Sequence, residues 1–237
     1  MRTLLIYNAV GADAMASLAE TVKLTESRCF NYQRYNKVII SDADTLCPIE
    51  WPGQRVKNAY TAGMLNNSRL ANAGLDYADF TEMDCAIFLG ADGVIDSYID
   101  RQPRPFSYCP TWLEHTDPFD GPPRFSGYFC LTREIIRAYR FCEGFYGRGH
   151  EDSDFAFNVL FAAGYLPYPD GPRAIARDHP PRVYGWCTDE AKNRNVQLFR
   201  RRVVVNVLRS NLSLAPHPVI GDDDRAWVLA EIARLET

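Results

Sequence analysis

The 237-residue sequence has no long apolar run, no paired cysteine motif and no strong net charge. A membrane-spanning helix needs about 20 consecutive apolar residues, and no segment approaches that length. The first eight residues turn polar too soon for a secretory signal, so we expect a strand there and a cytoplasmic protein. The seven scattered cysteines form no C-x-x-C pair, which argues against a disulfide framework or a zinc cage. A net charge of −4 makes the whole molecule no obvious binder of polyanions.

Short apolar runs alternate with helical patterns through the first hundred residues. The expected strands are Thr3–Tyr7, Lys37–Ser41 and Cys85–Leu89, and the expected helices are Ala12–Thr25 and Asn67–Ala78. This alternation predicts an α/β fold with a mostly parallel central sheet flanked by helices. Ligands of such sheets bind beyond the carboxyl ends of the strands, where we expect Asp42, Asp44 and Asp92. A capped strand end explains Asp42 and Asp44 nearly as well.

The second half of the chain is less regular. Residues 102–124 are rich in proline and aromatics without a period, which predicts a long loop over the site. A strand over Phe125–Leu131 and a helix over Arg133–Phe141 are expected next. The basic segment 192–209 contains no acid, and a solvated helical face explains it about as well as a docking surface. Residues 222–224, all aspartate, are expected to cap a final amphipathic helix.

The most informative segment is Gly149-His150-Glu151-Asp152-Ser153-Asp154, which opens an apolar helical run. Gly164 is expected to end that helix. Acids at a helix start cap free amides and complement the macrodipole, which explains the three carboxylates without any chemistry. A site that binds a hydroxyl-bearing substrate and takes its proton needs the same residue types.

Five segments, in order over most of residues 3–180, resemble the β-1,4-galactosyltransferase-like group of GT-A fold glycosyltransferases. The segments are Asn72-Ala73-Gly74 with Ala78, Cys85 to Asp92, Phe125-Ser126-Gly127 with Arg133, Gly149 to Asp154, and His179. The resemblance implies a Rossmann-like nucleotide-diphospho-sugar transferase fold. It implies a catalytic domain over residues 1–185, with a nucleotide-sugar half (1–100) and an acceptor half (101–185). Residues 186–237 would form a helical extension.

The resemblance also implies a role for each matched residue. Asp152 would remove the proton of the acceptor hydroxyl, and Glu151 would bind acceptor or donor hydroxyls. Asp92 and His179 would hold a divalent cation, Mn²⁺ or Mg²⁺, that neutralises the leaving diphosphate. The nucleotide-sugar would be bound by Asn8, Asp42, Asp44, Arg69, Asp92 and Gly127. We expect residues 92, 152 and 179 to converge on one pocket.

The chain also departs from the family pattern. Gly90 stands where the metal motif has its first aspartate, which leaves one carboxylate. Arg148 replaces a tryptophan, and Ala176 stands near a second metal-side position without a donor atom. Asp92 can also be interpreted as an ordinary turn residue, and His179 as a core or surface histidine paired with its neighbour Asp178. The sugar and acceptor preferences of relatives therefore do not transfer.

The leading hypothesis is a metal-dependent inverting glycosyltransferase that moves a sugar from a UDP-sugar to a hydroxyl. The acceptor would be a glycan or a hydroxymethylated base in DNA, and the segment 192–209 could contact an anionic surface. A bacterial or viral origin fits this reading. One alternative is a catalytically impaired nucleotide-sugar-binding module, suggested by Gly90. Another is a nucleotidyltransferase-like enzyme that uses Asp42 and Asp44 on two metals, which leaves Glu151 and Asp152 unused.

Overall fold

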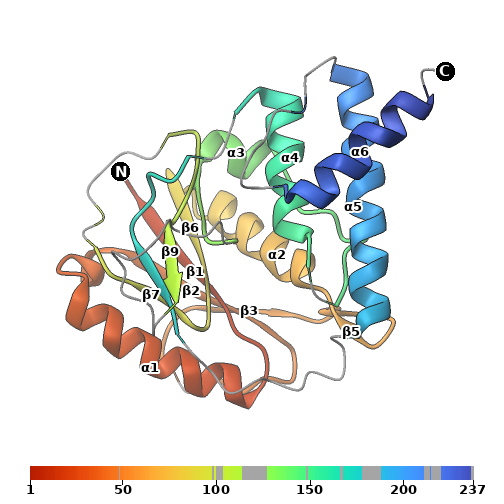
Figure 1. Cartoon of the computed structure of the whole chain (residues 1–237). Helices are drawn as coiled ribbons and strands as arrows, with labels where there is room; N and C mark the ends of the chain where they lie inside the picture. The colour runs from red at the N-terminus through yellow and green to blue at the C-terminus, as the bar shows by residue number, and fades with distance from the viewer. Residues whose placement is uncertain are drawn as a thin grey trace. The chain divides into compact units, whose positions relative to one another are not determined.

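The computed structural model describes residues 1–47, 49–97, 99, 104–113, 127–147, 149–165, 168–177, 188–210, 214 and 220–235. The chain, drawn in Figure 1, packs into two compact units. Unit 1 comprises Met1–Ala59, Arg69–Arg140 and Pro167–Arg182, and unit 2 comprises Tyr60–Ser68, Phe141–Leu166 and Val183–Thr237. The predicted division at residues 185 and 186 concerns functional domains and stays a prediction.

Unit 1 is built on a six-stranded sheet with the order β3-β2-β1-β6-β10-β8. Its strands are β1 (Thr3–Asn8), β2 (Asn36–Asp42), β3 (Gly53–Val56), β6 (Cys85–Gly90), β8 (Phe106–Tyr108) and β10 (Phe129–Thr132). The first four in spatial order run parallel, whereas β10 runs antiparallel to both β6 and β8. The predicted α/β fold with a mostly parallel sheet is therefore confirmed.

The two faces of β1 receive different helices because successive side chains of a strand point to opposite sides. Leu5 and Tyr7 join a core cluster with Met15 and Leu18 of α1 (Ala12–Arg28). Ile6 points to the opposite face, which packs against α2 (Asn67–Phe80). A Cβ on Gly74 of that helix would lie 2.9 Å from Ile6 Cγ2. Glycine at position 74 thus allows the close approach of this helix to the sheet.

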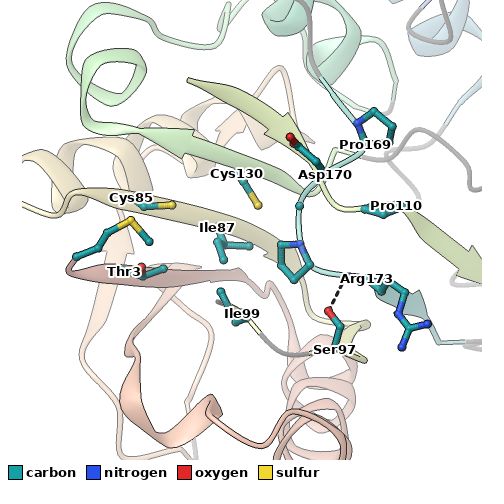
Figure 2. Close-up of a pocket in the computed structure, with 13 residues that line it drawn as sticks. Thr3, Cys85, Ile87, Ser97, Ile99, Pro110, Cys130, Pro169, Asp170 and Arg173 are labelled. Atoms are coloured by element: carbon teal, nitrogen blue, oxygen red, sulfur yellow. Dashed lines mark hydrogen bonds between the residues drawn. The ribbon is translucent and has the colours of Figure 1, made fainter. Parts of the chain in front are cut away.

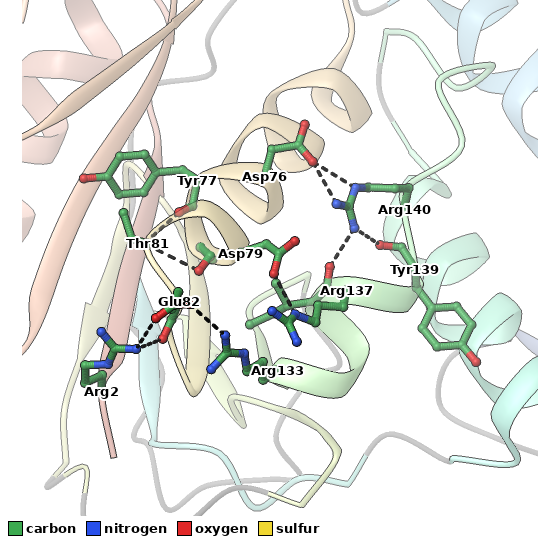
Figure 3. A network of polar contacts seen from close by, with 12 residues as sticks. Arg2, Asp76, Tyr77, Asp79, Thr81, Glu82, Arg133, Arg137, Tyr139 and Arg140 are labelled. Atoms are coloured by element: carbon green, nitrogen blue, oxygen red, sulfur yellow. Dashed lines mark hydrogen bonds and ion pairs between the residues drawn. The ribbon is translucent and has the colours of Figure 1, made fainter.

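Ion pairs join α2 to the short helix α3 (Arg133–Ala138) and to the residues that follow it, as Figure 3 shows. Arg137 Nε lies 2.8 Å from Asp79 Oδ1, and an Arg140 nitrogen lies 2.8 Å from Asp76 Oδ1. Glu82 is within 4 Å of both Arg2 and Arg133. Pairs as exposed as these contribute little to stability, typically about 0–1 kcal/mol each.

The middle of the chain corrects three sequence predictions. The expected loop over 102–124 contains β8 and also β9 (Thr111–Leu113), which forms a second sheet with β7 (Gly93–Ile95) and β11 (Ala174–Ala176). Residues 101–103 and 114–126 lie outside the described residues. The strand expected from Phe125 begins at Phe129, and the helix expected to reach Phe141 ends at Ala138, because Tyr139 is extended (φ −125°).

The described residues of unit 2 form a hairpin and three helices. The elements are β4 (Tyr60–Thr61), β5 (Met64–Leu65), α4 (Glu151–Ala163), α5 (Asp189–Ser210) and α6 (Asp222–Leu235). Gly164 ends α4 in the left-handed conformation (φ 72°), with its N–H donating to Leu160 O, as predicted. α6 begins at Asp222 as expected, but it buries Val228 while Leu229 and Leu235 stay exposed. Among the described residues, no helix is both long enough and apolar enough to cross a membrane.

Candidate functional site

The carboxyl ends of three adjacent strands bring together part of the predicted nucleotide-sugar site. Asn8 ends β1 and pairs with Ile40 on one side and with Gly90 on the other. The ends of β2 and β6, with Asp42 and the turn to Asp92, therefore flank Asn8. The side-chain oxygen of Asn8 is buried and has no hydrogen-bond partner among the described residues. An acceptor atom is thus left unsatisfied at the edge where α/β sheets bind ligands.

Asp42 is buried and organises the turn that follows β2. Its Oδ1 accepts hydrogen bonds from the Thr45 backbone N–H at 3.1 Å and from the Thr45 hydroxyl. Thr45 Oγ1 in turn accepts the N–H of Gly11, the residue before α1, at 2.7 Å. Asp44 is exposed. The contacts of Asp42 match the interpretation as a capped strand end, and they shape the loop beside Asn8.

Asp92 follows β6 in a turn and is held by an aromatic hydroxyl. Tyr128 Oη donates to Asp92 Oδ1 at 3.0 Å, and burial together with the charge of Asp92 raises the pKa of Tyr128 well above 10. A Cβ on Gly90 would lie 2.5 Å from Asp92 Oδ1 and 3.3 Å from Tyr128 Oη. The space that a first aspartate of the metal motif would need is therefore occupied by the Asp92 carboxylate itself.

The described residues do not complete a metal site. They contain no group of three or more His, Cys, Asp or Glu side chains placed to hold an ion. Asp92 offers a hard oxygen ligand, while the second predicted ligand, His179, lies outside the described residues. Ala176 ends β11 and has no donor side chain. The predicted metal requirement stays a prediction.

Two further predicted residues have identified surroundings. Arg69, near the start of α2, donates from its guanidinium to Asn58 O at 2.8 Å. Gly127 is half-buried and directly precedes the Tyr128 that contacts Asp92. Gly127 is thus one residue from the tyrosine that holds Asp92, and Arg69 donates to the loop before β4.

The carboxylate segment in unit 2 follows an unusual turn. Gly147, Gly149 and His150 all have positive φ, at 78°, 104° and 69°. A non-glycine residue rarely adopts this conformation, and such residues cluster at active sites and ligand-binding turns. His150 caps α4 through its backbone, because its carbonyl accepts the N–H of Asp154 at 2.9 Å. The turn places Glu151 and Asp152 in the first turn of the helix.

Burial makes Glu151 and Asp152 unusual acids. Burial and the neighbouring charge of Asp152 raise the pKa of Glu151 to about 7, against the hydrogen bond that Asn67 Nδ2 donates to Glu151 Oε1 at 3.1 Å. Burial also raises the pKa of Asp152, opposed by the Ser153 N–H that donates to its Oδ1 at 2.8 Å. Since the charge of Asp152 acts on Glu151, Asp152 ionises first. At neutral pH the pair can both accept and donate a proton.

The third acid of the segment is structural. Asp154 is buried, and its Oδ1 accepts a hydrogen bond from Arg202 Nε of α5 at 2.5 Å. Burial raises the pKa of Asp154, and the paired guanidinium lowers it. Asp154 therefore ties the first turn of α4 to α5 within unit 2.

Several cations of the basic segment 192–209 are used inside unit 2. The Arg194 guanidinium carbon lies 3.3 Å from the centre of the Tyr146 ring, and Arg200 Nε donates to Asp224 at 2.7 Å. Arg202 binds Asp154 as described above, whereas Arg201 and Arg209 are exposed. These contacts favour a packed helix over a dedicated docking surface.

Three residues that contact the predicted site were missed from the sequence. Thr45 holds Asp42, Tyr128 holds Asp92, and Asn67 holds Glu151. Each of the three lies within two residues of a predicted site residue along the chain. No local pattern in the sequence, however, indicates which residue it contacts. Asp92 belongs to unit 1, Glu151 and Asp152 belong to unit 2, and His179 is not described. The convergence of these residues stays a prediction.

A cavity of about 330 Å³ lies elsewhere in unit 1 (Figure 2). It is lined by the first residues of β1 and β6, Thr3 and Cys85, and by Cys130 and the segment 169–173. The Arg173 N–H donates to Ser97 Oγ at its border, at 2.8 Å. The cavity thus lies at the amino ends of the parallel strands, and no predicted site residue lines it.

Comparisons with known proteins bear on the fold. No family model matches the chain, and no curated protein sequence matches it. Among solved structures, S. aureus TarS 1–349 in complex with UDP is similar, with a TM-score of 0.58 and 12% identity over 98% of this chain and 71% of that chain. The chain spans 43% of the longer TarS structure.

Two other glycosyltransferase structures are similar. The mannosyltransferase PcManGT from Pyrobaculum calidifontis, in complex with GDP-Man and Mn²⁺, has a TM-score of 0.54 and 15% identity over 98% of this chain and 75% of that one. A Drosophila β1,4-galactosyltransferase 7 in complex with manganese, UDP-Gal and xylobiose has a TM-score of 0.50 and 14% identity. The match covers 82% of this chain and 79% of that chain. The chain has the GT-A fold of these enzymes, and at such identities the likeness is one of fold.

Proposed function

We propose that the protein is a glycosyltransferase that moves a sugar from a UDP-sugar to an acceptor hydroxyl with inversion. The observation that carries the proposal is the half-buried pair Glu151 and Asp152, in the first turn of α4 behind a turn with three positive φ values. A GT-A fold and an unsatisfied buried oxygen on Asn8 at the strand edge support it. The inverting, β-1,4-galactosyltransferase-like character comes from the sequence resemblance.

In the proposed reaction, Asp152 accepts the proton of the acceptor hydroxyl as that oxygen attacks the anomeric carbon. The bond from this carbon to the diphosphate breaks, and UDP leaves with the electron pair. Because its pKa is raised to about 7, Glu151 stays protonated to a higher pH than an ordinary glutamate. The protonated carboxyl can donate a hydrogen bond to a sugar oxygen. We further propose that Asn8, Asp42, Asp44, Arg69, Asp92 and Gly127 bind the donor. Mn²⁺ or Mg²⁺ held by Asp92 and His179 remains part of the proposal, without a step assigned to it.

The acceptor stays open between a glycan and a hydroxymethylated base in DNA. The internal contacts of Arg194, Arg200 and Arg202 leave fewer cations for a polyanion. If the glycan is lipid-linked, it is met at a membrane surface, so salt-dependent retention on DNA compared with anionic vesicles separates the two docking ideas. Retention on DNA falls with salt more steeply the more phosphates are contacted.

The proposal is tested by release of UDP from a panel of UDP-sugars with candidate hydroxyl acceptors. Asp152→Asn should lower turnover by about 10²- to 10⁴-fold while nucleotide-sugar binding is retained. Asp223→Asn, on an exposed residue of α6, is the matched control and should leave turnover unchanged. Full turnover of the Asp152→Asn variant would overturn the proposed role.

The second candidate is a nucleotide-sugar-binding module without turnover. It is favoured by Gly90, which leaves a single carboxylate in the metal motif. Wild-type protein that binds UDP and releases none from any UDP-sugar, with every acceptor tried, would support this module. The contacts of Asp42 and the exposure of Asp44 offer no support for a two-metal nucleotidyltransferase.

A further inference from the structure

We propose that one face of α5 holds the turn that carries Glu151 and Asp152 in its active geometry. The positioning residues are Asn195, Phe199 and Arg202. The inference rests on the proposed function, since it assigns residues that act through the two carboxylates of the same site. It also means that α5, which the sequence places in a C-terminal extension, is required for transfer.

The three residues share one side of the helix. Their spacing of four and three residues places them in one stripe, which faces the chain that leads into α4. Asn195 and Phe199 are fully buried. Asn193, Gln197 and Arg201 lie on the exposed side of the same helix. Since a solvated helix needs no buried amide, the burial of Asn195 points to a specific partner.

Asn195 satisfies the turn directly. Its side-chain amide donates to Gly149 O at 3.1 Å and to Tyr146 O at 3.3 Å. Arg194 donates to the same Tyr146 carbonyl while it stacks on the Tyr146 ring. A buried carbonyl without a donor costs about 1–3 kcal/mol, so these bonds favour the observed turn over alternatives.

Phe199 and Arg202 fix the next residues. The Phe199 ring stacks on the His150 imidazole, with centroids 5.0 Å apart and planes 19° from parallel. His150 is the non-glycine residue at φ 69°, a strained conformation that persists only where its surroundings hold it. Arg202 donates to Asp154 Oδ1, while Asp154 Oδ2 has no hydrogen-bond partner among the described residues. Contacts at 149, 150 and 154 thus bracket Glu151 and Asp152.

Two pairs of variants on α5 test the proposal with matched controls. Asn195→Ser is compared with Asn193→Ser, and Arg202→Lys with Arg201→Lys, because each pair makes the same chemical change on the buried and exposed sides. Phe199→Leu removes the stacking and keeps an apolar side chain. The measurements are amide hydrogen exchange over residues 146–154 and steady-state kinetics of sugar transfer, below the unfolding temperature of each variant.

The buried-side variants should exchange amides of 146–154 at least about tenfold faster, with other helices unchanged. Their kcat should fall about tenfold or more, with KM for the UDP-sugar within about twofold, because a small misplacement of a catalytic group costs rate. The controls should match wild type in both measurements.

Unchanged exchange in both Asn195→Ser and Arg202→Lys would overturn the proposal. Exchange that rises equally across the whole chain would also overturn it, because the residues would then be merely structural. If wild-type protein transfers no sugar, the proposed function fails, while the exchange pattern still decides whether α5 holds the turn.

Discussion

At the scale of single residues, Glu151 shows how burial changes the chemistry of a carboxyl group. Its pKa is raised to about 7 from 4.5, first by burial and then by the charge of Asp152. The folded state therefore prefers the protonated form. The stabilisation is fully present below pH 4.5 and is lost as the pH rises to about 7.

Glu151→Gln should remove this pH dependence, because glutamine cannot ionise and can still accept a hydrogen bond from Asn67. Relative to wild type, the variant should gain on the order of 2–3 kcal/mol in free energy of unfolding between pH 5 and pH 8. Urea unfolding at both pH values measures it, with the exposed Glu190→Gln as control. An equal difference at the two pH values would contradict the raised pKa.

Gly90 is a second residue whose side chain, or lack of one, decides local geometry. Because a Cβ would lie 2.5 Å from Asp92 Oδ1, Gly90→Ala must displace that carboxylate from Tyr128. We expect a loss of about 1–3 kcal/mol in the free energy of unfolding and weaker nucleotide-sugar binding.

Gly53→Ala in β3 is the control for Gly90→Ala, since its Cβ would meet only Ile39 O, at an ordinary 3.8 Å. Urea unfolding and nucleotide-sugar titration of both variants check the expectation. Equal losses in the two variants would show that the Asp92 carboxylate does not fill the space above Gly90.

At the scale of elements, two ion pairs of the same chemical type contribute differently to stability because they differ in burial. Arg202 binds Asp154, whose side chain is 3% exposed, whereas Arg137 binds Asp79, whose side chain is 37% exposed. Removing the partner of a buried charge leaves that charge uncompensated, while an exposed partner is replaced by water.

Arg202→Gln should therefore lower the free energy of unfolding by about 3 kcal/mol and Arg137→Gln by less than about 1 kcal/mol. Added salt should reduce the smaller loss more than the larger one, because exposed charges are screened. Chemical unfolding at low and high salt measures both. Similar losses for the two variants would mean that Arg202 is not tied to Asp154 in solution.

The elements also show what a sequence reveals. β1, β2 and β6 are each built on an uninterrupted apolar run, and their positions were predicted to within one residue at each end. β8 and β9 were missed, because strands of three residues beside Pro105 and Pro110 have no readable period. The turn before α4 was visible as a glycine-rich segment, but its holders Asn195, Phe199 and Arg202 come from a helix more than 40 residues later.

At the scale of the whole molecule, the sequence predicted the fold class because the α/β alternation repeats over a hundred residues. Candidate site residues could be named from the sequence mainly where a motif is contiguous, as in Glu151 and Asp152, and their roles stay predictions. Contacts such as Tyr128 with Asp92 join segments 36 residues apart, and nothing local encodes them. The cytoplasmic location, the metal and the convergence of residues 92, 152 and 179 remain predictions.

Donor binding can be read from the stability of the whole chain, because a ligand that binds only the folded state raises its unfolding temperature. A UDP-sugar at about 100 times its Kd should add roughly 2.7 kcal/mol to the free energy of unfolding. For a chain of this length, that raises the unfolding temperature by about 5–10 °C. GDP-mannose is the control for the base, and each nucleotide-sugar is measured with and without Mn²⁺. Asp92→Asn should remove most of the shift if Asp92 holds the cation that neutralises the diphosphate. A shift that is equal for UDP- and GDP-sugars would contradict the UDP preference, and one that is equal with and without Mn²⁺ would contradict the predicted metal requirement.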